Sequence, residues 1–247
     1  MSLDPTRRFS SHVEAYARYR PSYPRETLTL LERECGLTPA SKIADIGSGT
    51  GLLARLFLDF GCEVTGVEPN REMRATGERI LAGEPRFRSV EGRAEATTLP
   101  DSSVDFATAG QAFHWFEAAA ARTEFQRILK PGGWVVLIWN ERSVTPGFMA
   151  EHEELQNRFA REKPHPAGAE FDAFYGHTNW RMDRIPNLQL LDEAGLRGRI
   201  ESSSWSPLPG TDGYERMIHE ITRLFHNYEK EGRVTMEYET EIWWGTL

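Results

Sequence analysis

Residues 42–60 constrain the fold of this chain most, because they read as a strand, a turn and a helix in direct succession. Residues 43–46 form an apolar run broken only by Asp45, which is typical of a short buried strand. The turn that follows has glycine at every second position: Gly47, Gly49 and Gly51. Residues 52–58 are rich in leucine and favour a helix. This arrangement directs backbone N–H groups and a helix N-terminus toward a ligand, and glycine lets the ligand approach the main chain.

The spacing of the glycines separates two classes of ligand. A dinucleotide fingerprint, G-x-G-x-x-G, would need glycine or alanine where this chain has Leu52. A second apolar run, residues 63–68, ends in Glu68, and a carboxylate there can accept from both hydroxyls of a ribose. The turn needs no pyrophosphate, so a nucleoside with a charged amino-acid tail would fit as well. A nicotinamide-dependent oxidoreductase and a non-catalytic nucleoside-binding module remain as alternatives.

Strands and helices alternate through the first half of the chain. We expect strands at 42–46, 63–68, 86–91, 104–109 and 134–140, and helices near 51–60, 71–82 and 117–129. Such alternation predicts a parallel sheet with helices on both faces. Ligands of such sheets bind at the carboxyl ends of the strands.

Further blocks follow in a fixed order: Val67-Glu68-Pro69-Asn70, Gly92-Arg93-Ala94-Glu95, Leu99-Pro100-Asp101, Val104-Asp105 and Leu129-Lys130-Pro131-Gly132-Gly133. Together with residues 45–51 they resemble the class I S-adenosylmethionine-dependent methyltransferases. The resemblance implies methyl transfer from S-adenosylmethionine. It also implies a doubly wound, Rossmann-like α/β fold, whose mostly parallel seven-stranded sheet has a C-terminal antiparallel strand.

The resemblance also implies a set of cofactor-binding residues at the strand ends: Asp45, Gly47, Ser48, Gly49, Gly51, Glu68, Pro69, Ala94, Glu95 and Gln111. In the family, an acidic residue before the alanine commonly accepts from the adenine amino group. This chain has Arg93 there, which offers no acceptor. Glu95 either substitutes for that contact or is a solvated loop charge.

An aromatic block after the fourth strand, residues 111–116, is the first candidate for the acceptor side. Its aromatic and imidazole side chains either pack the next helix on the sheet or form a wall of the methyl-transfer pocket. We favour the pocket wall. His114 and Trp115 are therefore candidate substrate contacts. His114 is also the candidate general base for a phenol, amine or carbon acceptor, whereas a carboxylate acceptor needs no base.

The second candidate is the N-terminal arm, residues 1–35. Tyr16 and Tyr19 share one face of a short helix and Arg20 follows them. The arm either packs on the domain or closes over the acceptor. The arm and the aromatic block resemble those of small-molecule methyltransferases of the trans-aconitate and UbiE-like group.

The whole chain, residues 1–247, reads as one domain. We expect the arm, a cofactor-binding core at 36–140, a lid insertion at 141–185, and a return to the core at 186–247. In the last segment we expect a helix at 188–196 with a glycine C-cap, a strand at 199–205, a helix at 213–230 and a strand at 234–244. The insertion has an aromatic patch, residues 171–180, that would form part of the lid.

The composition limits the kinds of molecule that this protein is expected to bind. The net charge of −8 disfavours nucleic acid. The two cysteines lack the spacing of metal ligands, so we expect no metal site. We see neither a leader nor an apolar run of membrane-spanning length, and we expect a cytoplasmic protein with reduced cysteines. We expect a small-molecule acceptor, with O-methylation of a carboxylate as the leading case. The oligomeric state stays open.

Overall fold

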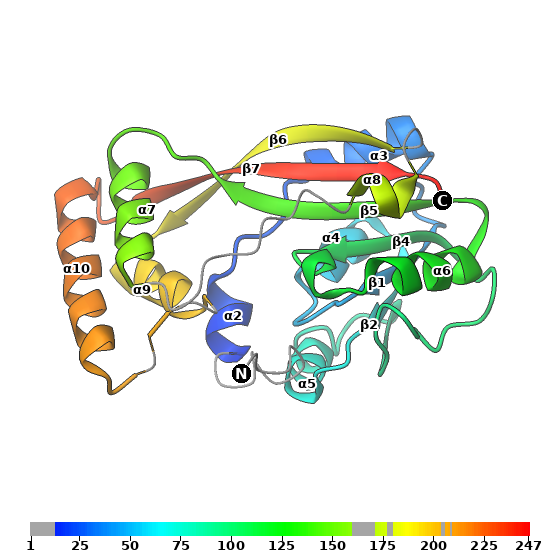
Figure 1. Ribbon diagram of the computed structural model, residues 1–247, viewed down its shortest axis with the longest axis horizontal. Helices are drawn as coiled ribbons and strands as arrows, with labels where there is room; N and C mark the ends of the chain where they lie inside the picture. The colour runs from blue at the N-terminus through cyan, green and yellow to red at the C-terminus, as the bar shows by residue number, and fades with distance from the viewer. Residues whose placement is uncertain (1–12, 160–170, 177–179, 204–205, 208) are drawn as a thin grey trace.

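A seven-stranded sheet forms the centre of the protein (Figure 1). The structure, a computed structural model, describes residues 13–159, 171–176, 180–203, 206–207 and 209–247. The strands lie in the order β3-β2-β1-β4-β5-β7-β6. Their bounds are β1 (Lys42–Ile46), β2 (Glu63–Val67), β3 (Phe87–Val90), β4 (Val104–Gly110), β5 (Leu129–Arg142), β6 (Trp180–Leu191) and β7 (Val234–Gly245). Only β7 runs antiparallel to its neighbours, which confirms the predicted fold class.

Helices cover both faces of the sheet. Their bounds are α2 (Val13–Tyr19), α3 (Glu26–Cys35), α4 (Leu52–Phe60), α5 (Arg71–Ile80), the 3-10 turn η1 (Phe113–Trp115), α6 (Ala118–Ile128), α7 (Phe148–Phe159), α8 (Phe171–Tyr175), α9 (Glu193–Glu201) and α10 (Asp212–Tyr228). One core cluster joins α3 and α4 to the sheet, and a second joins η1, α6 and α8 to the opposite face. The β-α alternation predicted from hydrophobic spacing is thus confirmed for residues 42–140.

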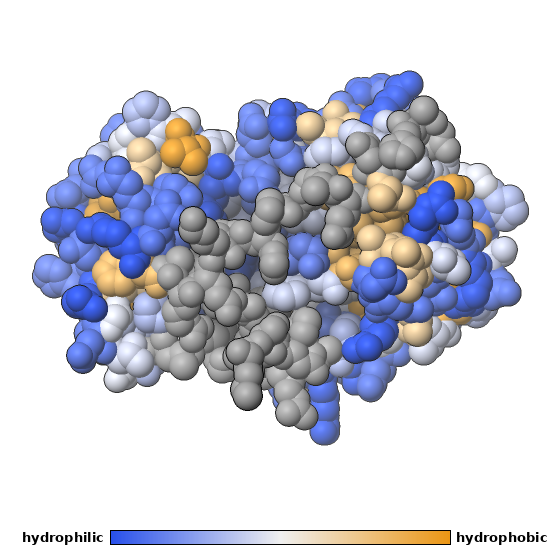
Figure 2. All heavy atoms as spheres, viewed as in Figure 1, coloured by the Kyte–Doolittle hydropathy of each residue, from blue (hydrophilic) through white to orange (hydrophobic). Residues whose placement is uncertain are grey.

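The long strands β5, β6 and β7 extend beyond the other strands and carry a third cluster at their far end. There α7, α9 and α10 pack together around buried side chains such as Met217, Ile221 and Phe225 (Figure 1). The outer surface over α7 and α10 is largely hydrophilic (Figure 2), since the apolar stripes of both helices face inward. Helix α2 packs between this group and α5.

The helix predicted at 188–196 and the strand predicted at 199–205 are wrong. Residues 188–191 end β6, where Leu188 pairs with Glu237 of β7. Helix α9 begins only after Asp192, whose carboxylate accepts the N–H of Gly195 at 2.7 Å, so that glycine lies in the first turn and is no C-cap. Leucine favours helices, but the pairing of β6 with β7 overrides this preference. Because β6 is an edge strand, Leu188 stays 65% exposed. Residues 204–205 lie outside the described part.

The described parts of the 141–185 segment pack against the body of the protein. Helix α7 packs on α10, and the aromatic residues of α8 enter the second core cluster. Phe171 stacks on Phe113 with ring centroids 5.2 Å apart, and on Trp243 at 4.4 Å. These rings therefore fill the core beneath the sheet. The lid stays a prediction, because residues 160–170 and 177–179 lie outside the described part.

Candidate active site

The glycine turn after β1 has the conformation that its sequence predicts. The φ angles of Gly47, Gly49 and Gly51 are +69°, +56° and +86°, which only glycine adopts freely. A Cβ on Gly47 would lie 2.7 Å from that of Ala112. The N–H of Gly47 donates to the Val67 carbonyl at 2.8 Å, which ties the turn to the end of β2. The turn therefore brings backbone close to the strand ends without side chains in the way.

Glu68 is the acidic group of this site, and it is only 7% exposed. One carboxylate oxygen accepts the N–H of Gly49 at 2.9 Å, and the other accepts the N–H of Asn70 at 2.8 Å. Burial raises the pKa of Glu68, while these two N–H groups oppose the rise. Each carboxylate oxygen has two lone pairs, so each retains one for a ligand hydroxyl.

Asp45 lies beneath the turn at the end of β1 and is 1% exposed. The Ala54 N–H and the Thr108 hydroxyl approach its carboxylate, but among the described residues neither they nor any other group reaches hydrogen-bond geometry. Burial raises the pKa of Asp45 to about 7, and the charge of Glu68 adds to the rise.

A cavity of about 420 Å³ opens beside the turn, within the ~300–1,000 Å³ usual for small-molecule sites. Nine of the residues predicted for the site line it: Tyr16, Gly47, Gly49, Glu68, Pro69, Ala94, Glu95, Gln111 and Trp115. Seven others complete the wall: Asn70, Met73, Arg93, Gly110, Ala112, Phe116 and Glu117. The carboxyl ends of β1, β2 and β4, the loop after β3, and α2 thus converge on one space.

Six predicted residues do not line this cavity: Asp45, Ser48, Gly51, Tyr19, Arg20 and His114. The Tyr19 ring packs on the backbone of α9, where a Cβ on Gly198 would lie 2.2 Å from it. The guanidinium of Arg20 stacks over the Tyr16 ring, with Cζ 4.7 Å from the ring centroid. The His114 ring lies against Trp115 at 4.8 Å between centroids.

One of the residues that sequence reasoning overlooked has a recognisable signal. Asn70 caps α5 by accepting the N–H of Met73 at 2.9 Å, the usual spacing for an N-cap. That cap stands two residues after Glu68, so the start of α5 had to face the same space. Arg93, named above only for the acceptor that it lacks, also lines the cavity, as does Glu117. Arg93 lies in the loop after β3 and Glu117 is the N-cap of α6, and hydrophobic spacing does not reveal that these two segments meet at the cavity.

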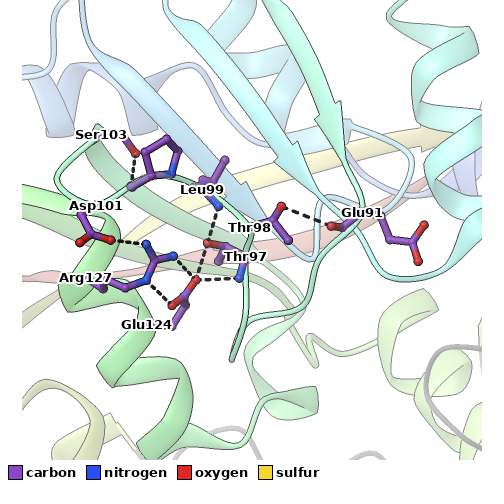
Figure 3. A network of polar contacts seen from close by, with 9 residues as sticks. Glu91, Thr97, Thr98, Leu99, Asp101, Ser103, Glu124 and Arg127 are labelled. Carbon is purple, nitrogen blue, oxygen red and sulfur yellow. Dashed lines mark hydrogen bonds and ion pairs between the residues drawn. The ribbon is translucent and has the colours of Figure 1, made fainter.

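A polar network fixes the loop that carries Ala94 and Glu95 (Figure 3). The carboxylate of Glu124 on α6 accepts the Thr97 N–H at 2.7 Å and the Thr97 hydroxyl at 2.6 Å. Arg127 donates to the same carboxylate through Nε at 2.8 Å, and it holds the pKa of Glu124 at about 2. Glu95 itself accepts the N–H of Glu117 at 2.8 Å. The cavity wall after β3 is thus anchored to α6.

The described residues hold no group of three histidine, cysteine, aspartate or glutamate side chains that could bind a metal. Within the same residues, no helix combines the length and the apolar character needed to cross a membrane.

The fold is that of an α/β protein, with a parallel sheet that has one antiparallel strand. The glycine turn lies beside the acidic end of a strand, which is typical of a site for a nucleoside-type cofactor. A family model described as a methyltransferase domain matches residues 44–137. An uncharacterized methyltransferase of Schizosaccharomyces pombe is 34% identical over 226 residues, covering 88% of this chain and 87% of that protein. The chain therefore belongs to the class I S-adenosylmethionine-dependent methyltransferases, as its sequence blocks predict.

Two other comparisons agree with this assignment. An uncharacterized methyltransferase of Mycobacterium tuberculosis is 37% identical over 150 residues, or 61% of this chain. The chain spans 59% of the length of that relative. A solved structure from Anaeromyxobacter dehalogenans, described as a candidate type II methyltransferase, has a TM-score of 0.71 at 22% identity. It covers 92% of this chain and 98% of its own, which supports the fold alone.

Proposed function

We propose that this protein transfers the methyl group of S-adenosylmethionine to a small acidic acceptor, and that it belongs to the trans-aconitate and UbiE-like group of small-molecule methyltransferases. The observation that carries the proposal is the buried Glu68 carboxylate, held against the glycine turn at the mouth of a cavity of about 420 Å³. Leu52 in place of a third fingerprint glycine disfavours the nicotinamide alternative.

The cofactor has a ribose, an adenine and a charged amino-acid tail, and the site offers a complement for each. Glu68 retains acceptor capacity for the ribose diol. Met73 and Phe116 flank the glycine turn, because a Cβ on Gly49 or Gly47 would meet them at 3.2 and 3.6 Å, and they offer apolar walls for adenine. The carboxylate of Asp45 does not line the cavity, but it lies next to the glycine turn and would favour the ammonium of the tail on that side.

When bound, the cofactor supplies an activated methyl group on a sulfonium, so the protein needs mainly to position the acceptor and exclude water. A carboxylate oxygen can attack the methyl carbon while the C–S bond breaks and its electron pair stays on sulfur. The products are a methyl ester and S-adenosylhomocysteine, and no proton is released. Tyr16 and Trp115 line the cavity and would contact the acceptor.

His114 remains a proposed base only for acceptors that must lose a proton. Its ring lies against Trp115 rather than in the cavity wall, which favours an acceptor that needs no base. An acidic acceptor also fits the arginine that follows α2, because guanidinium groups pair well with carboxylates.

The proposal is tested by calorimetry and by product analysis on the full chain. We expect S-adenosylmethionine and S-adenosylhomocysteine each to bind at one site, and NADH not to bind. With methyl-labelled cofactor, we expect label in a small carboxylic acid from a panel that also contains phenols and amines. Binding of NADH with no binding of either sulfur compound would contradict the proposal.

A further inference from the structure

Three arginines from distant parts of the chain converge beside the cofactor cavity. Arg20 directly follows α2, Arg142 ends β5, and Arg199 lies in α9. Arg199 is 5% exposed, and the side chain of Arg142 is 23% exposed. Burial and then the charge of Arg199 lower the pKa of Arg20 to about 10, and the same two causes lower the pKa of Arg142. The three like charges therefore act on one another in a poorly solvated space.

Little negative charge compensates this cluster. Among the described residues, its one ion pair joins Arg142 Nη2 to Glu153 Oε2 at 3.4 Å, and the glutamate side chain is 31% exposed. His152 is also close, and burial together with the charges of Arg142 and Arg199 lowers its pKa to about 3, so it is neutral. Three guanidinium charges thus face a single partly exposed carboxylate.

Three buried polar atoms in or beside the cluster lack a partner in the described part of the chain: Arg20 Nε, Arg142 Nε and His152 Nδ1. Buried donors without an acceptor destabilise a protein, and so do buried charges without a counter-charge. Each such group needs an explanation, and a bound anion is one that fits buried guanidinium donors.

Other contacts hold the guanidinium groups in place. Arg20 Nη2 donates to the Ser202 carbonyl at 3.0 Å. Arg199 Nε donates to the Tyr238 hydroxyl at 3.1 Å, and its Nη1 donates to the Ser203 hydroxyl at 3.2 Å. These bonds use only part of each group and fix its orientation. The remaining N–H groups are therefore preorganised for an anion.

The cluster adjoins the cofactor cavity along two routes. The Arg20 guanidinium stacks on the ring of Tyr16, and that ring lines the cavity. On β5, Arg142 stands two residues after Asn140, whose carbonyl accepts the side-chain amide of Gln111 at 3.3 Å. Gln111 also lines the cavity. Figure 1 shows α2 between the cofactor-binding half and the α7–α9–α10 group.

We propose that Arg20, Arg142 and Arg199 form an anion-binding site that holds a non-reacting acidic group of the methyl acceptor. The charge balance suits a doubly negative group, either the carboxylates of a di- or tricarboxylic acid or a phosphate monoester. The three arginines would then determine which acceptor reaches the methyl group. This inference rests on the proposed function, because it assigns the site to the acceptor of that reaction.

The test measures anion binding to the full chain, with S-adenosylhomocysteine present and ionic strength held constant. The probes are succinate, inorganic phosphate and uncharged dimethyl succinate, with binding followed by calorimetry and thermal melting. The variants are Arg142→Gln, at a partly exposed strand end, and Arg20→Gln. The matched control is Arg184→Gln, on the exposed edge of β6, where the arginine is 53% exposed and pairs with Glu241.

We expect succinate or phosphate to bind the wild type and the control, and the dimethyl ester not to bind. Arg142→Gln and Arg20→Gln should each weaken anion binding at least tenfold. Preference for succinate would identify a carboxylate ligand, and preference for phosphate a phosphate monoester. Equal anion affinity in all variants, or no anion binding to the wild type, would contradict the proposal that the three arginines form an anion-binding site.

Binding of S-adenosylhomocysteine, measured on the same samples, separates the two proposals. If it binds the wild type normally while anions do not, only the anion site fails. If it does not bind at all, the methyltransferase proposal fails whatever the anions do.

Discussion

Glu68→Ala is the substitution that most sharply tests the cofactor site. The carboxylate accepts one backbone N–H on each oxygen, at 2.8 and 2.9 Å, so one lone pair per oxygen is left for the ribose diol. Hydrogen bonds to a charged group contribute about 1.5–3 kcal/mol each. Because the carboxylate is already shared with two N–H groups, we expect a total loss near the value for one such bond. Binding of S-adenosylhomocysteine should therefore weaken roughly ten- to a hundredfold.

The same substitution removes the acceptor of the Gly49 and Asn70 N–H groups, so it also lowers the free energy of unfolding. The assay is therefore calorimetry on protein shown by circular dichroism and thermal melting to be folded at the titration temperature. Glu63→Ala is the matched control, since Glu63 begins the strand that Glu68 follows and its side chain is 40% exposed. A folded Glu68→Ala variant with an unchanged dissociation constant would refute the assignment.

Three further substitutions test other parts of the account. Gly198→Ala places a Cβ 2.2 Å from the Tyr19 ring, so we expect α2 to shift. The free energy of unfolding, measured by heat or urea, should fall by about 1–3 kcal/mol, and proteolysis of the arm should be faster. An unchanged melting temperature would contradict this packing. Glu124→Gln breaks the pairing with Arg127 and should lower the free energy of unfolding by about 1–2 kcal/mol near neutral pH. Because the pKa of Glu124 is depressed, its contribution to stability is complete above about pH 4.5 and disappears as the pH falls toward about 2. In urea titrations, the free energies of unfolding of the wild type and the variant should therefore converge over that pH range. A difference that stays constant with pH would contradict the depressed pKa. His114→Ala should leave turnover of a carboxylate acceptor within a few-fold, whereas a fall of about two orders of magnitude would indicate a base-dependent acceptor.

The core of the fold could be predicted because its signals are local. The glycine turn and the alternation of residues 42–140 each depend on neighbours in sequence, and the strand ends then had to converge at one edge of a parallel sheet. Eight of the nine predicted residues that line the cavity follow these strand ends, and the ninth, Tyr16, lies on α2. The N-cap Asn70 could have been added from the same kind of signal.

The remaining features depend on contacts between distant segments. The end of β6 was mistaken for a helix because only its pairing with β7 makes Leu188 part of a strand. The aromatic residues of α8 enter the core beside Phe113, a partner far away in sequence. Arg20 could be noticed in the sequence, but its convergence with Arg199 depends on how α2 docks on α9.

The most direct test of the central claim is the transfer of a labelled methyl group by the full chain. The protein is incubated with methyl-labelled S-adenosylmethionine and a dicarboxylic acid such as succinate, and both products are quantified by mass spectrometry. The account predicts a labelled monomethyl ester and an equal amount of S-adenosylhomocysteine, with the rate at limiting cofactor reduced in Glu68→Ala. Tight cofactor binding without label in any acid, phenol or amine of the panel would contradict it.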